Sequence, residues 1–502
     1  MKISKIVDSR KKWKEKAKGR GSTIRQLRKG AKNQKRQDSE KLSENDEIRR
    51  LTEENAELRA LLDERKLPLE GDPVIQQKCL CVIILICGIV SFRSVPRIMR
   101  IFQPLLRTKV RIPHFTSVIN WTLRAGIAIF SNVSTLSEPW LALIDCSIDI
   151  GTRKALVVLR VKLSALHHKK SAIGLGECEC IGMEISHSWN GQLVSEALTR
   201  VFEKTGLPVA IIKDGGTDLK KGVDPLCERN PDKKIHLIDD VGHFTANLLK
   251  ALFAGTKAFT TFLKIVSTGA ARIRQTNLAW LLPPKIRTKG RFQGITGVAN
   301  WAQKLLTMTS RKGNPTSDPD ATKARNAFVG LAKLRPFLTR FCNVCSIAEL
   351  FLELMKTKGL NENTYAAAKD ILVQLPARSL LRTRLSGWLE KHINIYRLIG
   401  NCNLSLPVSS DPIESLFGKF KTIIQRNPQA ELNRLMFVIP LLCGNHSLAS
   451  IDHALTQCSH AQMLTFIQNN VPETLRELRI KKMPKASTSV PKSGKRISPE
   501  TG

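Results

Sequence analysis

Three acidic side chains stand where the chain could bring them together. Asp145 closes the apolar run of WLALIDCSIDIGT, Asp214 closes that of PVAIIKDGGTD, and Glu414 lies in SSDPIESLFGKFK, where a helix is expected to begin. Carboxylate oxygens are ligands that Mg²⁺ and Mn²⁺ prefer. Three converging carboxylates can hold two such cations, one activating an attacking water or 3′-hydroxyl and the other stabilising the leaving oxygen of a phosphodiester. These residues therefore predict metal-dependent phosphoryl transfer with Mg²⁺ or Mn²⁺ as cofactor.

The segments around the two aspartates follow the pattern of a mixed α/β sheet. LALIDCS and ALVVLRVKL flank a turn and predict a hairpin, and ECECIGMEIS predicts a third strand. Asn190–Gly206 predicts a helix that ends at a glycine. The short strands PVAIIKDGG and KIHLIDD each precede a further helix, and the order predicts a sheet covered by helices. Asp214 ends its strand where open α/β sheets usually carry active residues, and His243, after the last strand, can approach the site, although a packed histidine is the simpler interpretation.

Structural explanations of the same carboxylates stay open. Asp145 and Asp214 can simply end strands, and Asp149 and Asp218 are rival carboxylates close by. In SSDPIESLFGKFK the aspartate can act as the helix N-cap, with proline as the first helical residue and Glu414 as the partner of a capping box. A capping glutamate would face the end of its helix rather than a metal.

The charge of the chain points to a polyanionic partner. The 502 residues include 80 Lys and Arg against 43 Asp and Glu, a formal net charge of +37. Such an excess repels itself unless a polyanion is the usual partner, and double-stranded DNA is the partner we predict. A ribosome-associated protein or a protein of anionic membranes is the alternative.

The cysteines and the longest apolar run indicate a cytoplasmic, nucleoid-associated protein without a membrane partner. Residues 1–42 are polar and basic without the apolar core of a secretory signal, so the 12 cysteines are expected to be free thiols. Cys342 and Cys345 form a lone CxxC that matches no recognised zinc framework. Residues 79–92 are apolar but shorter than the roughly 20 residues that span a bilayer, and they predict a buried helix or strand pair.

The N-terminal region predicts a basic arm followed by a coiled coil. Residues 1–42 are expected to be a disordered arm that follows DNA phosphates. In residues 43–66, Ile48, Asn55 and Leu62 share one seam of a heptad, and an asparagine at that position favours two strands in register. A homodimer, or a higher oligomer on DNA, is therefore expected. An amphipathic helix that packs on its own domain is the alternative.

Residues 73–130 predict a helix-turn-helix-like DNA-binding domain. Two amphipathic segments flank a break, and Ile112-Pro113 marks the start of the second helix, from about His114 to Ala128. The side chains expected to project from that helix toward DNA are Thr116, Ser117, Asn120 and Arg124.

The remaining boundaries complete an α/β core interrupted by helices. The predicted parts are a first part of the core over 140–255, an all-α insertion over 256–405, a second part with the Glu414 helix over 406–470, and a disordered basic tail over 481–502.

The order of these features resembles the RNase H-like core of DDE transposases. The motif ESLFGKFK is similar to the glutamate helix of bacterial insertion-sequence transposases, in which a basic residue follows two turns after the glutamate. The resemblance implies that Asp145, Asp214 and Glu414 are the catalytic metal ligands and that Lys421 and Lys419 contact DNA. It further implies cleavage of transposon ends and their joining to target DNA. The alternatives are a transposase-derived DNA-binding protein without catalysis, and a structure-specific nuclease on the same fold.

Overall fold

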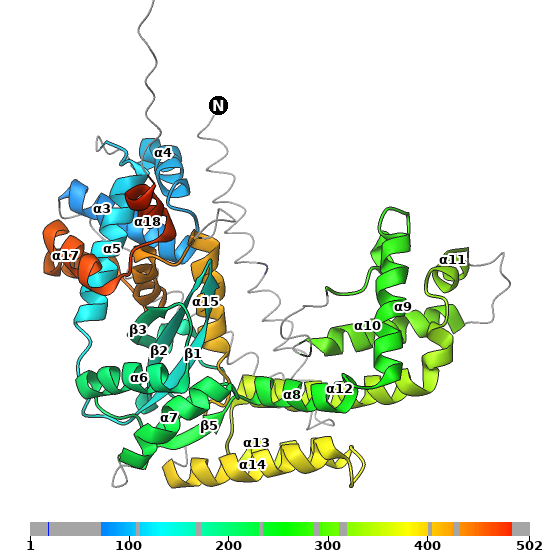
Figure 1. Ribbon diagram of the computed structural model, residues 1–502. Coiled ribbons are helices and arrows are strands. Elements are labelled where there is room, and N and C mark those ends of the chain that lie inside the picture. Colours follow the sequence, from blue (N-terminus) through cyan, green and yellow to red (C-terminus); the bar gives the residue numbers. More distant parts are fainter. Residues whose placement is uncertain are drawn as a thin grey trace, which may run out of the picture. The chain divides into compact units, whose positions relative to one another are not determined.

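The computed structural model describes residues 72–106, 111–166, 172–229, 234–285, 294–310, 319–399, 404–424 and 431–483, with the single residues 19 and 292 (Figure 1). Contacts divide the chain into two units, Met1–Pro73 and Val74–Gly502. The predicted basic arm, coiled coil and all but the first residues of the basic tail lie outside the described residues. The description below concerns the second unit.

A mixed five-stranded sheet forms the centre of this unit. Its strand order is β3-β2-β1-β4-β5; β1, β2 and β3 pair antiparallel, and β1, β4 and β5 pair parallel. All five predicted strands are therefore confirmed. The strands are β1 (Trp140–Ile150), β2 (Arg153–Lys162), β3 (Cys178–Ser186), β4 (Ala210–Lys213) and β5 (His236–Asp239).

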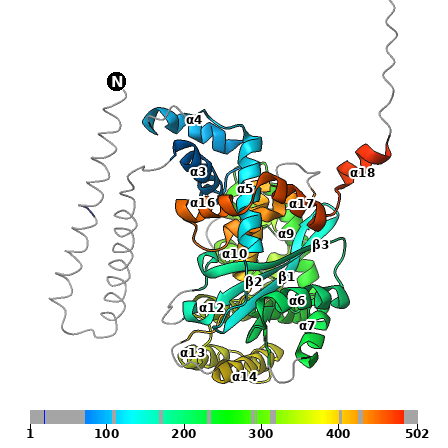
Figure 2. The same cartoon turned by 90° about the vertical axis from the view of Figure 1, so that its left-hand side faces the viewer.

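Both faces of the sheet are buried, which explains why its strands read as nearly continuous apolar runs. Side chains alternate between the faces of a strand, so Leu141 and Leu143 of β1 enter one apolar core while Ala142 and Ile144 enter another. The second core is closed by α6 (Gly191–Thr205) and α7 (Thr217–Arg229), which lie beside the strands (Figure 2). Gly206 ends α6 with a φ of 82°, as the sequence predicts.

The helices before the sheet pack against the last quarter of the chain. The apolar run 79–92 lies mostly in α3, with buried side chains, so the predicted buried helix is confirmed. None of the described helices is both long and apolar enough to cross a membrane. The helices and 3-10 turns of these two regions are α3 (Pro73–Gly88), α4 (Ser94–Leu106), α5 (Phe115–Ser131), η5 (Arg434–Leu442), α16 (Leu448–Gln457), α17 (His460–Asn470) and α18 (Leu475–Lys482).

Helix α5 is a packing element at the centre of that region. It lies against η5, α16 and α17. A Cβ on Gly126 would lie 1.8 Å from the carbonyl oxygen of Phe437, so only glycine lets the two backbones approach this closely. That this helix presents its side chains to DNA stays a prediction, but neighbouring elements cover much of the surface of the helix.

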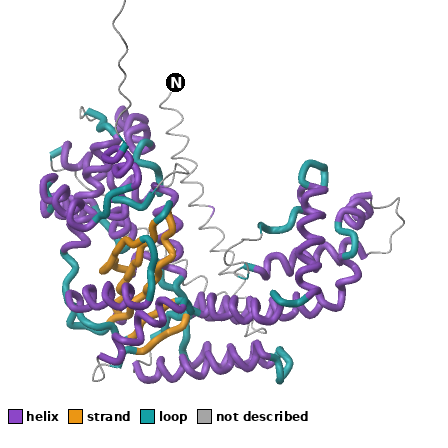
Figure 3. The backbone as a smooth tube through the Cα atoms, viewed as in Figure 1, coloured by secondary structure: helices purple, strands orange, loops and turns teal. Residues whose placement is uncertain are grey.

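Helices alone fill the described chain between β5 and the Glu414 helix, apart from 3-10 turns and the isolated β-bridge Leu360↔Leu406 (Figure 3). Phenylalanines build the core there, with the Phe341 ring 4.9 Å from that of Phe253. This agrees with the predicted helical insertion. Within the predicted bounds its helices are α9 (Lys257–Ile273), α10 (Ile295–Ser310), α11 (Pro319–Ala327), α12 (Arg335–Lys358), α13 (Glu362–Val373) and α14 (Leu380–Ile399). Helix α8 (Val241–Phe253) precedes them, in the predicted first part of the core, and α15 (Asp411–Ile424) follows them.

Candidate functional site

The two predicted aspartates follow register-paired residues on neighbouring parallel strands. Ile144 of β1 pairs with Lys213 of β4 as the last pair of that ladder, and Asp145 and Asp214 come next on the two strands. Neighbouring strands are about 4.8 Å apart, so the two aspartates lie side by side at the end of the β1–β4 ladder. A bulge in β1 directly after Asp145 breaks the register with β2 there, and bulges commonly re-aim a side chain.

The surroundings of the two aspartates differ. Asp145 is 5% exposed. Asp214 is half-buried, and its Oδ1 accepts a hydrogen bond of 2.8 Å from the backbone N–H of Gly216, which fixes the turn into α7. Burial, and then the negative charges of Asp145, Asp214 and Asp218, raise the pKa of the Cys146 thiol. The rival Asp218 is exposed in the first turn of α7.

Asp240 and His243 form a pair at the start of α8 that the sequence analysis did not identify. Asp240 caps the helix: its Oδ1 accepts hydrogen bonds from the His243 backbone N–H at 2.6 Å and from Nδ1 of the ring at 3.0 Å. Burial raises the pKa of Asp240, but the hydrogen bonds and charge of His243, together with the backbone donors, outweigh it and bring that pKa to about 2. Asp240 is therefore a buried carboxylate that stays ionised.

The same carboxylate holds the start of the Glu414 helix. Its Oδ2 accepts hydrogen bonds from the Ser410 backbone N–H at 2.6 Å, from the Ser410 hydroxyl at 2.9 Å and from the Ser409 hydroxyl at 3.3 Å. The backbone N–H of Glu414 donates to the Ser410 carbonyl, so Ser410 is the N-cap. The alternative in which Asp411 is the N-cap is therefore wrong. The Asp411 N–H that a capping Glu414 would accept is donated instead to the Ser409 hydroxyl at 3.2 Å.

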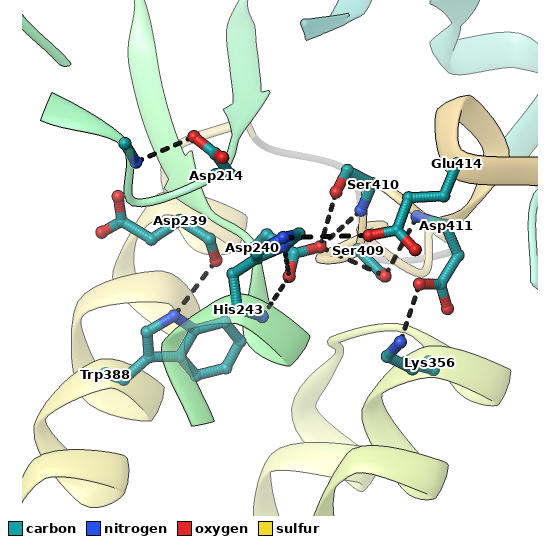
Figure 4. A network of polar contacts seen from close by, with 11 residues as sticks. Asp214, Asp239, Asp240, His243, Lys356, Trp388, Ser409, Ser410, Asp411 and Glu414 are labelled. Atoms are coloured by element: carbon teal, nitrogen blue, oxygen red, sulfur yellow. Dashed lines mark hydrogen bonds and ion pairs between the residues drawn. The ribbon is translucent and has the colours of Figure 1, made fainter. Parts of the chain in front are cut away.

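His243 connects this pair to Glu414 (Figure 4). Its Nε2 lies 3.8 Å from Oε1 of Glu414. The hydrogen bond to Asp240 raises the pKa of His243 to about 9, although burial opposes this shift. The negative charges of Asp240, Asp214 and Glu414 act in the same direction as the hydrogen bond. The ring is therefore an imidazolium near neutral pH and lies among three carboxylates. The interpretation of His243 as a merely packed histidine is corrected by this contact.

Glu414 is half-exposed and accessible to a ligand. Its side chain is 45% exposed, and partial burial raises its pKa although the positive charge of His243 opposes this. One turn earlier, Oδ1 of Asp411 accepts a 2.7 Å contact from Nζ of Lys356, which comes from α12 of the insertion. The site is thus built by the sheet, by α8, by α15 and by an insertion helix.

The three predicted metal ligands do not form a closed set. In the described part of the chain, no three or more His, Cys, Asp or Glu side chains are grouped so that they could hold a metal ion. Asp145 and Asp214 are neighbours, whereas Glu414 is held against His243. The donor atoms are the carboxylate oxygens that Mg²⁺ and Mn²⁺ prefer, so the residues fit such an ion in kind and would have to draw together around it.

A cavity of about 750 Å³ opens beside Glu414, between the site and the insertion. His243 and Glu414 line one part of its wall, and Lys285 and Lys356 are the lysines in the remainder. Its full lining consists of Asp240, Gly242, His243, Ala246, Leu249, Lys285, Phe292, Gly294, Thr296, Glu349, Leu352, Glu353, Lys356, Asp411 and Glu414.

The residues predicted to contact DNA lie in two different settings. On α15, Lys419 is exposed and Lys421 is partly exposed. On α5, Thr116 is exposed and Ser117 and Asn120 are half-buried.

Arg124 is engaged within the protein. Its guanidinium donates hydrogen bonds of 2.6 Å to the carbonyls of Leu455 and Cys458 at the end of α16. DNA contact by the α5 residues stays a prediction, and for Arg124 it would cost these two internal bonds.

Comparison with known proteins finds distant similarity among solved structures. No protein-family model matches the chain, and no curated protein matches its sequence. Among solved structures, the chain is similar to the Drosophila P element transposase strand transfer complex, with 12% sequence identity and a TM-score of 0.38, over 78% of this chain and 98% of that chain. A similarity at this level carries no residue-by-residue correspondence, so the interpretation of the site rests on its own geometry.

Proposed function

We propose that the chain is a DNA transposase that cuts transposon ends and joins them to target DNA by divalent-metal-dependent phosphoryl transfer. The observation that carries the proposal is the register of the sheet: Asp145 and Asp214 directly follow the paired residues Ile144 and Lys213 on neighbouring parallel strands. Glu414 is brought to the same region, because it and Asp214 both act on His243. Asp145, Asp214 and Glu414 are the proposed metal ligands.

The topology supports an RNase H-like assignment of the core. Three antiparallel strands are followed by two strands parallel to the first, in the order β3-β2-β1-β4-β5. A helical insertion separates β5 from the helix that carries Glu414. This arrangement resembles the interrupted catalytic core of DDE transposases.

The residues of the chain bind and orient the reactants. A bound Mg²⁺ or Mn²⁺ pair would activate the attacking oxygen and stabilise the leaving one. Asp145 and Asp214 present neighbouring carboxylates for such ions, and α15 delivers Glu414. Asp240 fixes the His243 ring by two hydrogen bonds, so the imidazolium keeps a positive charge beside Glu414. Glu414 would complete the ligand set by turning from His243 toward the aspartates.

The DNA strand is proposed to run over α15 toward the cavity. Lys419 and Lys421 lie on the helix of Glu414, and Lys285 and Lys356 lie in the cavity wall. Lysines near a phosphodiester contribute affinity and make it salt-dependent. The net charge of +37 fits the same partner. A homodimer or higher oligomer on DNA, associated with the nucleoid, is the form we propose.

The test is DNA cleavage with matched carboxylate variants. Wild-type protein with Mg²⁺ or Mn²⁺ should nick and join a duplex that carries the terminal inverted repeats flanking its own reading frame. Asp145→Asn and Asp214→Asn should abolish both reactions and keep DNA binding. Asp218→Asn, at an exposed carboxylate four residues after Asp214, is the control and should leave the rate unchanged. Cleavage that survives Asp214→Asn would remove the proposal.

A second candidate is a transposase-derived DNA-binding protein without catalysis. One observation favours it: in the described residues the ligands are not closed around a metal position, and Glu414 is held by His243. It predicts sequence-specific, metal-independent DNA binding and no cleavage in any divalent ion. A structure-specific nuclease, by contrast, would cut branched or unpaired DNA without requiring particular end sequences.

A further inference from the structure

Asp239, the last residue of β5, makes hydrogen bonds and an ion pair with three side chains of insertion helix α14. Nε1 of Trp388 donates a 3.1 Å hydrogen bond to the Asp239 carbonyl, and the Asp239 backbone N–H donates a 3.0 Å bond to Nε2 of His392. Nζ of Lys391 lies 2.7 Å from Oδ2 of Asp239. Positions 388, 391 and 392 share one face of α14 because residues three and four apart are helix neighbours. Insertion helix α14 thus binds both backbone groups and the side chain of Asp239.

The Trp388 and His392 side chains that contact Asp239 are held in one geometry. Trp388 and His392 are 3% and 0% exposed, and their rings stack with centroids 4.2 Å apart. Nδ1 of His392 donates to the Trp388 carbonyl at 2.6 Å, which leaves Nε2 as the acceptor for Asp239. A buried polar group that shifts loses its hydrogen bond without gaining one from water, so these contacts favour a single position of α14 relative to Asp239.

Asp239 stands next to the residues that build the site. On its other side, Nζ of the buried Lys213 lies 3.1 Å from Oδ1 of Asp239, and Lys213 directly precedes Asp214. The following residue, Asp240, donates its backbone N–H to the Lys213 carbonyl at 2.9 Å. Asp240 in turn holds His243 and Ser410. A displacement of Asp239 would therefore be passed to both sides of the site.

We infer that Trp388, Lys391 and His392 are positioning residues: through Asp239 they hold the Asp214 turn and the Asp240–His243 pair in the geometry that delivers Glu414. The catalytic role of this geometry rests on the proposed function. The insertion is then an integral part of the active site, and its contacts should change the rate of the chemical step without changing DNA affinity.

A matched pair of tryptophan variants tests the inference. Trp388→Phe and Trp301→Phe each remove one indole N–H bond to a backbone carbonyl of the described chain, of 3.1 Å and 2.9 Å. The acceptor of Trp301 is Leu281, within the insertion, and not a residue of the sheet. The assay is single-turnover cleavage of the terminal-repeat duplex at saturating DNA, with the Kd measured separately. Trp388→Phe should slow cleavage about five- to tenfold with an unchanged Kd, since one lost hydrogen bond and a small misplacement have effects of this size. Trp301→Phe should stay within about twofold.

Lys391 and His392 provide a second comparison. Lys391→Gln should slow cleavage several-fold, whereas Lys369→Gln, which removes an exposed lysine with a 3.6 Å contact to Glu390 on the same insertion, should not. His392→Gln keeps a hydrogen-bond acceptor and should retain most of the rate that His392→Leu loses. A general loss of insertion stability would affect both members of each pair alike, and that result would overturn the inference.

Hydrogen–deuterium exchange gives a readout that does not depend on cleavage. In Trp388→Phe, peptides that contain the His243 and Ser410 amides should exchange faster than in wild-type protein, because both amides donate to Asp240. Trp301→Phe should leave these peptides unchanged. If wild-type protein cuts no DNA but this difference is observed, the proposed function fails while the positioning of Asp240 stands. Equal exchange in the two tryptophan variants would overturn the positioning itself.

Discussion

Acidification should destabilise the protein through His392, by an amount that follows from its burial. The ring is 0% exposed, and its two nitrogens are committed to the Trp388 carbonyl and the Asp239 N–H. Burial lowers the pKa of His392 from 6.5 to about 4, against the opposing hydrogen bond to Trp388. When the ring is protonated, both of its nitrogens carry a proton, and it can no longer accept the hydrogen bond from the Asp239 N–H. Protonation would therefore break this contact between α14 and the sheet.

The sign and size of the effect follow from proton linkage. Because the folded-state pKa is depressed, the unfolded chain binds more protons between pH 6.5 and pH 4. The contribution of His392 is thus fully present above pH 6.5 and is lost as the pH falls through that window. At 1.36 kcal/mol per pKa unit, the loss amounts to about 2 kcal/mol at pH 5 and approaches about 3 kcal/mol below pH 4.

Urea unfolding of variants separates this contribution from those of other groups. Burial also lowers the pKa values of His236 and His446, so the measured quantity is the difference between wild type and His392→Gln at each pH. That difference should change by about 2 kcal/mol between pH 7.5 and pH 5, provided that fluorescence and circular dichroism transitions coincide. The exposed His460→Gln is the control and should track wild type. A His392→Gln protein with the full wild-type pH dependence would refute the reasoning.

Three further predictions concern a buried carboxylate, a pair of glycines and the basic N-terminal region. Asp240→Ala should lower the free energy of unfolding by about 3 kcal/mol in urea titrations, because it leaves the charged His243 and the Ser410 N–H without their buried acceptor. Gly126→Ala should lower the free energy of unfolding by about 2 kcal/mol or more, since the new Cβ would lie 1.8 Å from a backbone carbonyl oxygen. Gly387→Ala, on α14 with no atom within 4 Å of its Cβ position, should raise that free energy by about 0.5–1 kcal/mol. Thermal unfolding of the two variants distinguishes these outcomes. Deleting residues 1–42 should flatten the salt dependence of DNA binding, measured as the slope of log Kd against log salt.

Local sequence signals were sufficient for the five strands and for locating Asp214 after its strand. A strand in a sheet buried on both faces is a continuous apolar run, and the residue after that run is visible in the sequence. Asp214 was therefore identified directly after β4, whereas Asp145, predicted near the end of its strand, lies in the middle of β1, which continues to Ile150. The two residues are neighbours because both follow the last pair of the β1–β4 ladder. The bulge after Asp145 was not predictable, because it depends on the partner strand rather than on β1 alone.

Contacts between distant segments explain what the sequence analysis missed. Asp240 accepts a hydrogen bond from the backbone N–H of Ser410, which is far away in the sequence, and no local sequence pattern predicts that contact. The short-range half of the pair was visible, since an aspartate three residues before a histidine at a helix start is a capping pattern. Arg124 is a similar case: the sequence places it on α5 but gives no sign that carbonyls at the end of α16 accept its hydrogen bonds.

The long interval between Asp214 and Glu414 does not oppose the proposed ligand set, because the helical segment between β5 and α15 leaves and re-enters the core at one place. The backbone N–H of Val241, at the start of α8, donates a 2.9 Å hydrogen bond to the carbonyl of Val408, just before α15. The bridge between Leu360 and Leu406, with bonds of 2.8 and 2.9 Å, ties the returning strand to the end of α12. Loop-closure entropy grows only slowly with length, so an insertion whose ends are paired in this way adds little to the cost of bringing Glu414 to the sheet. The same pairing means that the insertion cannot shift without moving the segment that carries Ser410, and with it the helix of Glu414.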